Sequence, residues 1–328
     1  MSYQSLYTIT NQILAYVSSI SEKIGNISAT HNLESRPHLW RNNRIRSIHS
    51  SLKIEANSLS LGQVRDIING KIVLGKQKEI QEVKNAFDAY ERIKEIDPYD
   101  IEELKKSHGI MTKYVVDISG EFRNSDEWVF DDRGRFIAPP PYLVPSLMDD
   151  LFNWMQDEKD NTHPLILSCI FHYEFVFIHP FCDGNGRIAR LWHTTPLSKW
   201  KPIFEYIPLE SQIEKFQDDY YSAIAKCHVL GESTLFIEFM LSQIDKILDD
   251  ISKQVNEDIE QIDPNIKKLL DVMEDDVSYS SNELMQKLNL KAKEGFRRNY
   301  LRPAIDQNLI YMTIPDKPKS KNQRYIKV

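Results

Sequence analysis

Apolar residues recur along most of the chain at spacings of three and four, the period of an amphipathic helix, which predicts a mainly α-helical protein. The run HPLILSCIFHYEFVFI, residues 163–178, is too long for a single strand and predicts a helix buried on all sides. The segments expected to be helical are residues 11–24, 36–56, 79–95, 100–117, 144–157, 164–178, 184–200, 210–228 and 233–256.

Two segments depart from this pattern. Residues 122–141 carry aromatic and β-branched side chains on both sides of a turn cluster and end in a proline run, which predicts a surface β-hairpin. After Asp263-Pro264 the order changes to that of a winged helix: helices at about 265–275, 281–288 and 295–307, then strands at 309–314 and 323–328. We therefore expect three regions, residues 1–98, 99–258 and 263–328.

The composition indicates an ordinary soluble chain. Its 328 residues are 41% hydrophobic and 27% charged, which argues against disorder, collagen-like repeats and a membrane span. The three cysteines have no C-x-x-C spacing, so neither a disulfide framework nor a zinc knuckle is predicted. The N-terminus has no basic and continuously apolar signal segment, and the expected location is the cytoplasm.

Charge is divided unevenly along the chain. The net charge is −7, but residues 263–328 hold 13 Lys and Arg against nine Asp and Glu. The preceding part, with 28 basic and 39 acidic residues, is an unfavourable surface for nucleic acid. The pattern leaves open whether the winged helix contacts DNA or docks on a protein.

The segment that follows the buried helix has the features of a phosphate site. Gly184 and Gly186 stand where the next helix begins, so several backbone N–H groups can converge on one anion. Arg187 and Arg190, three residues apart, share a helix face and offer forked donors to phosphates. Neither a P-loop nor a dinucleotide-binding fingerprint is present.

Two further side chains complete the chemistry. Asp183 supplies a hard oxygen ligand that suits Mg²⁺ bound with nucleotide phosphates. His179 has the pKa range needed to take a proton from a hydroxyl group at neutral pH. A turn between two core helices would explain each of these residues alone, but their combination favours the phosphate site.

These residues carry a resemblance to a known family. The sequence HPFCDGNGRIAR, residues 179–190, fills every specified position of H-x-F-x-[DE]-G-N-G-R-x-x-R, so the chain resembles the Fic family. The stretch GEFRNSDEWVF is similar to the family's flap, and KIVLGKQKEIQEVKNAFDAYERI to an N-terminal region found in many members. The resemblance implies a mainly α fold, a Fic-type helical bundle with a small β-hairpin flap, followed by a winged helix-turn-helix domain.

The resemblance also implies an activity. A Fic protein of this type is an adenylyltransferase that transfers AMP from ATP to a Ser, Thr or Tyr hydroxyl of a target protein, and to itself. His179 would then be the general base and Asp183 would hold Mg²⁺. The phosphates would be bound by Gly184, Asn185, Gly186, Arg187 and Arg190. Phe181 would anchor the loop, and Cys182 stands at a variable position.

Other implied roles lie outside the motif. The flap residues Trp128, Val129 and Phe136 would dock the target segment by strand-like pairing. Tyr220 would lie beside the adenine. His108 reads as a structural histidine, and a metal cluster of His172, Asp183 and His193 is disfavoured because no compact ligand spacing is present.

A second motif predicts autoinhibition. Ser51 and Glu55 share a helix face at i, i+4. Many Fic proteins carry an inhibitory [ST]-x-x-x-E-[GN] helix that often continues E-G-N, and Ser51, Glu55 and Asn57 match this longer pattern. Ala56 stands where the family usually has glycine. The resemblance implies that Glu55 pairs with Arg190 in cis and so acts at the ATP site.

Several alternatives remain open from the sequence. The chain could mainly remove AMP, with Glu55 orienting water, or could use another phosphate donor. It could instead be a DNA-binding regulator that acts through the winged helix. A homodimer is also left open.

Overall fold

The computed structural model describes residues 6–30, 37–126, 128–131, 134–260, 263–274, 277–306, 309–314, 317–318 and 320–327. For residues 28–30, 37–39, 128–131, 134–137 and 254–260 it describes the backbone only. The chain forms two compact units, one of Met1–Glu22 with Arg41–Leu248 and the other of Lys23–Trp40 with Asp249–Val328. The division into residues 1–98, 99–258 and 263–328 stays a prediction.

The helices up to residue 260 are α1 Asn11–Thr30, α2 Pro37–Ile54, α3 Leu61–Ile68, α4 Gln77–Glu91, α5 Ile101–Met111, α6 Val144–Glu158, α7 Pro164–Ile178, α8 Asn185–Trp200, α9 Leu209–Lys215, α10 Gln217–Leu230 and α11 Thr234–Glu260. Short 3₁₀ turns occupy Pro141–Leu143 (η2) and Pro202–Tyr206 (η3). The hairpin consists of β1 Trp128–Asp131 and β2 Gly134–Ile137, antiparallel, with Trp128 opposite Ile137.

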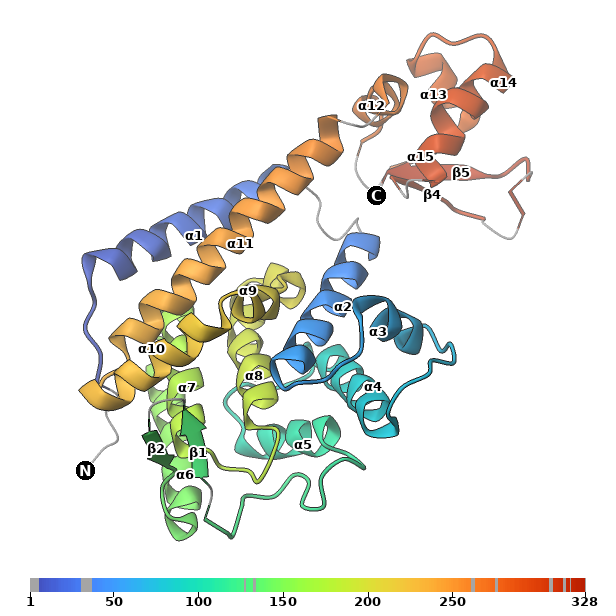
Figure 1. Ribbon diagram of the computed structural model, residues 1–328. Coiled ribbons are helices and arrows are strands. Elements are labelled where there is room, and N and C mark those ends of the chain that lie inside the picture. Colours follow the sequence, from blue (N-terminus) through green and yellow to red (C-terminus); the bar gives the residue numbers. More distant parts are fainter. Residues whose placement is uncertain are drawn as a thin grey trace. The chain divides into compact units, whose positions relative to one another are not determined.

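Helices α7 and α8 form the centre of the first unit (Figure 1). Eleven of the 15 residues of α7 and 13 of the 16 residues of α8 are buried, as expected of a helix surrounded by others. Their apolar side chains join those of α2, α4, α5 and α6 in one hydrophobic core. The loop between α7 and α8, residues 179–184, is therefore mounted on two rigid elements.

The C-terminal part has its own core. Its elements are α12 Pro264–Asp271, β3 Ser278–Ser280, α13 Ser281–Lys287, α14 Lys293–Phe296, the π-helical turn η4 Arg297–Leu301, α15 Arg302–Asp306, β4 Ile310–Met312 and β5 Arg324–Lys327. The three strands are antiparallel in the order β3-β5-β4, and Ile266, Leu284 and Phe296 lie in the core. The predicted helices and the final two strands are present, and β3 is an addition to the predicted order.

Most predicted elements are confirmed within a few residues, and the mainly α fold class is correct. The sequence pattern missed α3 and the three-residue strand β3. Helix α3 has only eight residues, and a capping box of Ser60 and Gln63 stabilises its start. The helix expected at 210–228 is two helices that meet at Phe216.

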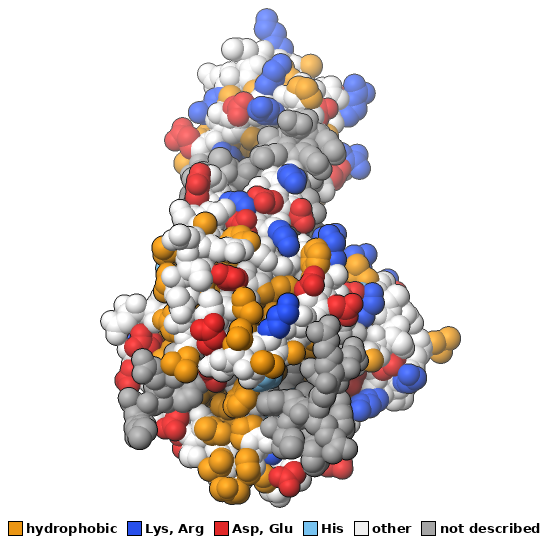
Figure 2. All heavy atoms as spheres, turned by 60° about the vertical axis from the view of Figure 1, so that its left-hand side comes forward, with side chains coloured by type: hydrophobic (Ala, Val, Ile, Leu, Met, Phe, Trp, Pro, Cys, Tyr) orange, Lys and Arg blue, Asp and Glu red, His pale blue; other side chains and the backbone are white. Residues whose placement is uncertain are grey.

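On the face shown in Figure 2, acidic and basic side chains alternate with small groups of hydrophobic ones. Within the described ranges, no helix is both long enough and apolar enough to cross a membrane.

Candidate active site

His179 stands at the point where α7 ends. Its backbone is left-handed, with φ 51° and ψ 59°, and its N–H donates to the Phe175 carbonyl at 2.9 Å. Pro180 follows and cannot continue the helix, because proline disfavours the α conformation in the residue before it. The chain thus turns sharply at His179, in a conformation that is uncommon for a residue other than glycine.

The loop after His179 is closed on itself by Asn185. The Asn185 Nδ2 group donates to the Phe181 carbonyl at 2.6 Å, and the Phe181 N–H donates to Asn185 Oδ1 at 3.0 Å. The Phe181 ring is fully buried and stacks on the His108 ring, with centroids 3.7 Å apart and planes 6° from parallel. Phe181 is therefore the loop anchor that the sequence predicted, and Asn185 fixes the shape of the loop.

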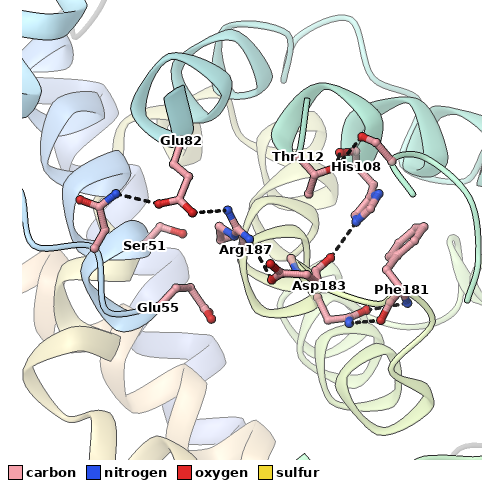
Figure 3. Close-up of polar contacts among 12 residues, drawn as sticks. Ser51, Glu55, Glu82, His108, Thr112, Phe181, Asp183 and Arg187 are labelled. Carbon is pink, nitrogen blue, oxygen red and sulfur yellow. Dashed lines mark hydrogen bonds and ion pairs between the residues drawn. The ribbon is translucent and has the colours of Figure 1, made fainter. Parts of the chain in front are cut away.

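His108 supports this loop from α5. The Gly120 N–H donates to His108 Nδ1 at 2.9 Å, so Nε2 carries the proton and donates to the Asp183 carbonyl at 2.8 Å (Figure 3). Burial lowers the pKa of His108 to about 4, which keeps the ring neutral at pH 7 with this one tautomer. The structural role expected for His108 is thus a specific one: it holds the backbone of Asp183.

Gly184 begins α8 in the left-handed region, at φ 85°. A Cβ atom on this residue would lie 2.9 Å from Thr112 Cγ2, so glycine is needed for space as well as for conformation. Its N–H donates to Asp183 Oδ1 at 2.5 Å. The aspartate carboxylate therefore lies at the N-terminus of α8, and 47% of its side chain is exposed.

Arg187 lies one turn along α8 and is held by two carboxylates. Its Nη2 donates to Asp183 Oδ1 at 3.0 Å, and its Nη1 lies 3.7 Å from Glu82 Oε1 (Figure 3). The guanidinium is almost fully buried, and its Nε has no hydrogen-bond partner among the described residues. A buried donor without a partner at a helix N-terminus is suited to an anionic ligand.

Glu82 of α4 was not identified from the sequence. Its Oε2 accepts from Asn57 Nδ2 at 2.8 Å, so it links Asn57 to Arg187. The only available signal was its position in KIVLGKQKEIQEVKNAFDAYERI, the stretch similar to an N-terminal region of many Fic proteins.

Arg190 pairs with Glu55, as the second motif implied. Its Nη2 donates to Glu55 Oε1 at 2.7 Å and to the Ser51 carbonyl at 2.9 Å, and its Nε donates to Ser51 Oγ at 3.1 Å. The Arg190 side chain is 1% exposed and that of Glu55 34%. Burial is the largest single effect and opposes the charge of Arg190, but Glu55, Tyr220 and Tyr90 together outweigh it and raise the pKa of the guanidinium.

The Glu55 carboxylate also lies against Gly186. A Cβ atom built on Gly186 would collide with Glu55 Oε1 and would lie 3.1 Å from Arg190 Nη1. Glycine at position 186 thus leaves room for an oxygen atom above the first turn of α8, and Glu55 Oε1 occupies that room.

Ala56 adopts the conformation for which the family's usual glycine is suited. Its φ is 63°. Two backbone hydrogen bonds end α2 here: the Ala56 N–H donates to the Lys53 carbonyl at 3.0 Å, and the Asn57 N–H donates to the Leu52 carbonyl at 3.1 Å. This is a Schellman motif, in which glycine is preferred at the left-handed position. With alanine at this position the chain still leaves α2 through a left-handed residue, but its backbone is strained.

The predicted base is a neutral imidazole. Burial lowers the pKa of His179 to about 4; the charge of Arg123 acts in the same direction, and the carboxylates of Glu55 and Asp183 oppose it. At neutral pH the ring can therefore accept a proton.

Other predicted site residues are less directly connected to the loop. Tyr220 is buried, and its hydroxyl lies 2.8 Å from His172 Nε2; its role beside adenine stays a prediction. The side chains of Trp128, Val129 and Phe136 lie outside the described residues. Across the described ranges, no group of three or more His, Cys, Asp or Glu residues could hold a metal ion.

Comparisons with known proteins find relatives in one family. Residues 98–197 match the model of the Fic/DOC family, and residues 264–326 match the C-terminal domain of Fic-like proteins (filamentation induced by cAMP). The crystal structure of a Fic family protein from Desulfovibrio desulfuricans is 41% identical, with a TM-score of 0.75, and the match covers 99% of this chain and 98% of that one.

Two curated relatives are more distant. The protein adenylyltransferase fic-1 of Caenorhabditis elegans is 29% identical over 59% of this chain, and the protein adenylyltransferase Fic of Drosophila melanogaster is 29% identical over 70% of it. The chain spans less than half of their lengths, 38% and 47% respectively. Both matched domains and the end-to-end similarity to the Desulfovibrio protein show that the chain belongs to the Fic family.

Proposed function

We propose that this chain is a protein adenylyltransferase, which transfers AMP from ATP to a Ser, Thr or Tyr hydroxyl of a target protein and to itself. The observation that carries the proposal is the set of groups around one helix N-terminus: a neutral His179, an open Asp183 carboxylate and the buried guanidinium groups of Arg187 and Arg190. The names of the curated relatives support it.

The residues divide the chemical work among them. Backbone N–H groups at Gly184 to Gly186 and the two arginines neutralise phosphate charge, and the neutral imidazole of His179 takes the proton of the attacking hydroxyl. General base catalysis supplies about 10²- to 10⁴-fold, so positioning and charge neutralisation must supply the rest of the acceleration. A target segment paired along the flap would bring its hydroxyl to His179.

The donor set fits a nucleotide-bound magnesium ion. Mg²⁺ is commonly held by one or two carboxylates together with substrate phosphates, and Asp183 supplies one partly exposed carboxylate at this place. When bound, Mg²⁺ would offset the negative charge of the phosphates.

The same site is proposed to be inhibited by Glu55. The carboxylate uses Arg190 Nη2 and the space beside Gly186, both of which a phosphate oxygen at this helix N-terminus would need. With Arg190 engaged, ATP would bind without a properly held terminal phosphate. Because Ser51, Glu55 and Arg190 belong to one chain, the inhibition is in cis.

Incubation with ATP labelled at the α-phosphate tests the proposal. Wild type should label weakly, Glu55→Gly strongly, and Glu55→Gly with His179→Ala not at all. Mass spectrometry of the modified protein should find an AMP adduct, whereas a phosphate adduct would show that a different group of ATP is transferred. Equal labelling of Glu55→Gly and of its His179→Ala derivative would refute the assignment.

The reverse reaction is an outcome of the same experiment. Protein labelled by the Glu55→Gly variant is freed of ATP and mixed with unlabelled wild type. Loss of label that depends on Glu55 would show that the wild-type chain mainly removes AMP. Stable label would support transfer as its main activity.

A further inference from the structure

Arg123 lies just before the hairpin and donates only to backbone carbonyl groups among its described hydrogen bonds. Its Nε donates to the His179 carbonyl at 2.7 Å, and its Nη2 to the carbonyls of Pro139 at 2.5 Å and Ile178 at 3.4 Å. Its Nη1 donates to the Ser125 carbonyl at 2.9 Å. The residue is 2% exposed.

These carbonyl groups belong to two parts of the chain that are far apart in sequence. Ile178 is the last residue of α7, and His179 is the predicted base that follows it. Ser125 lies shortly before β1 and Pro139 shortly after β2, so they are the two feet of the hairpin. In addition, the Arg123 N–H donates to the Pro180 carbonyl at 2.9 Å. One residue therefore connects both feet of the hairpin to the turn that carries His179.

The electrostatics of this position suit an arginine. The last carbonyls of a helix have no partner within the helix and carry partial negative charge, so a cation near them is favourable. A guanidinium group offers five N–H donors in a fixed plane, whereas a lysine ammonium is a single point of charge on a flexible chain. Only the planar fork can hold several carbonyls in fixed relative positions.

The conformation of His179 gives this contact its importance. The left-handed backbone at φ 51° is unfavourable for histidine and persists only where the surroundings hold it. The carbonyl that Arg123 Nε binds belongs to this strained residue. Loss of the contact would allow the imidazole and the hairpin to move independently.

We propose that Arg123 is a positioning residue that couples the target-docking hairpin to the catalytic histidine, so that a hydroxyl presented by a bound target meets His179 at the correct place. The inference rests on the proposed adenylyltransferase function. It assigns Arg123 no contact with ATP, and it predicts that turnover and nucleotide binding respond differently to its replacement.

The kinetic test uses Arg123→Gln and Arg123→Lys in the Glu55→Gly background, with self-labelling from ATP as the assay. We expect Arg123→Gln to lower kcat by about 10- to 100-fold, the loss typical of slightly misplaced reacting groups, with KM for ATP within about twofold. Arg123→Lys should recover only part of kcat. Arg44→Gln is the matched control, because Arg44 is also buried and its described contacts are to Tyr90, Glu91 and Tyr206.

The pH profile separates positioning from general destabilisation. Arg123 is a cation beside His179, so its loss should raise the pKa of the imidazole and move the acid limb of the rate profile to higher pH. Arg123→Lys should leave that limb near its original place. A kcat within twofold of the parent, or a loss that Arg44→Gln reproduces at equal thermal stability, would overturn the proposal.

Two measurements do not require turnover. NMR titration of His179 should show the upward pKa change in Arg123→Gln, and amide exchange should quicken by about tenfold or more in peptides from both Arg123 to Pro139 and Val176 to Phe181. If Glu55→Gly transfers no label, the proposed function is wrong, but the titration and the amide exchange still test whether Arg123 couples the hairpin to His179. An unchanged titration together with unchanged exchange contradicts it.

Discussion

Removal of the Glu55 carboxylate is expected to strengthen ATP binding. The 2.7 Å contact with Arg190 is a charge-assisted hydrogen bond, a type that contributes about 1.5–3 kcal/mol. Because 34% of the Glu55 side chain is exposed, water screens the pair, and the lower part of this range, about 1.5–2 kcal/mol, is appropriate. If ATP must displace this contact, Glu55→Gly should bind ATP about 10- to 30-fold more tightly.

Titration calorimetry with Mg²⁺ and ATP measures this directly, and thermal melting gives an independent check. Without ATP, Glu55→Gly leaves a buried guanidinium with fewer partners, so its melting temperature should fall. Saturating ATP should restore it. Glu55→Gln, which keeps the size of the side chain without its charge, should lie between wild type and Glu55→Gly. An affinity within twofold of wild type would refute the competition between Glu55 and phosphate.

Gly186→Ala tests whether a phosphate oxygen uses the space beside Gly186 that Glu55 Oε1 occupies. The added methyl group would collide with Glu55 Oε1, so it should break the pair with Arg190 without relieving inhibition, since it also fills the place of the phosphate oxygen. ATP affinity should stay low in Gly186→Ala and in its combination with Glu55→Gly. Tight ATP binding by the double variant would show that phosphate does not use this space.

Two stability measurements complete the predictions. Ala56→Gly should raise the free energy of unfolding, measured in urea, by about 0.5–1 kcal/mol. The reason is that relief of about 1–2 kcal/mol of left-handed backbone strain at Ala56 exceeds the free-energy cost of the added entropy of the unfolded chain. Labelling from ATP should stay at the wild-type level, and a lower free energy of unfolding would contradict the presence of strain. Burial is the main cause that lowers the pKa to about 4 in three histidines, His108, His179 and His193. In the unfolded chain these side chains bind protons as the pH falls below about 6.5, whereas in the folded chain they stay neutral down to about pH 4. The free energy of unfolding should therefore decrease between about pH 6.5 and pH 4. Each contributes up to roughly 3 kcal/mol, and urea unfolding at pH 7, 6 and 5 that shows no decline would contradict this.

The local parts of the site were predictable because their residues are neighbours in sequence. The end of α7 at His179-Pro180, the glycine at the start of α8 and the shared face of Arg187 and Arg190 follow from backbone geometry within one short segment. The pair of Glu55 and Arg190 spans 135 residues and was found only through the resemblance. Ala56, a departure from the pattern, adopts the left-handed conformation all the same, because the packed ends of the motif determine it.

The supporting residues could not be predicted in the same way. His108 binds a carbonyl 75 positions away, and Arg123 one that is 56 positions away; each contact is to backbone, which carries no side-chain signal. Glu82 looks like one of many acidic residues on a solvated helix until Arg187 and Asn57 are placed beside it. Tertiary packing decides such contacts, and no local pattern contains them.

The partners of Arg123, Arg187 and Arg190 explain how a fixed site can still exchange ligands. Arg123 donates to main-chain carbonyls, which cannot rotate away, so its charge is permanently engaged. Arg187 is held by side-chain carboxylates, which can rotate away, and Arg190 is held by one such carboxylate together with Ser51. Under the proposed function, a phosphate group can bind a guanidinium group only where the present partner of that guanidinium is able to move away. Because Asp183 Oδ1 is itself a partner of Arg187, a cation that draws this oxygen away frees the guanidinium, so metal and phosphate should bind with positive coupling.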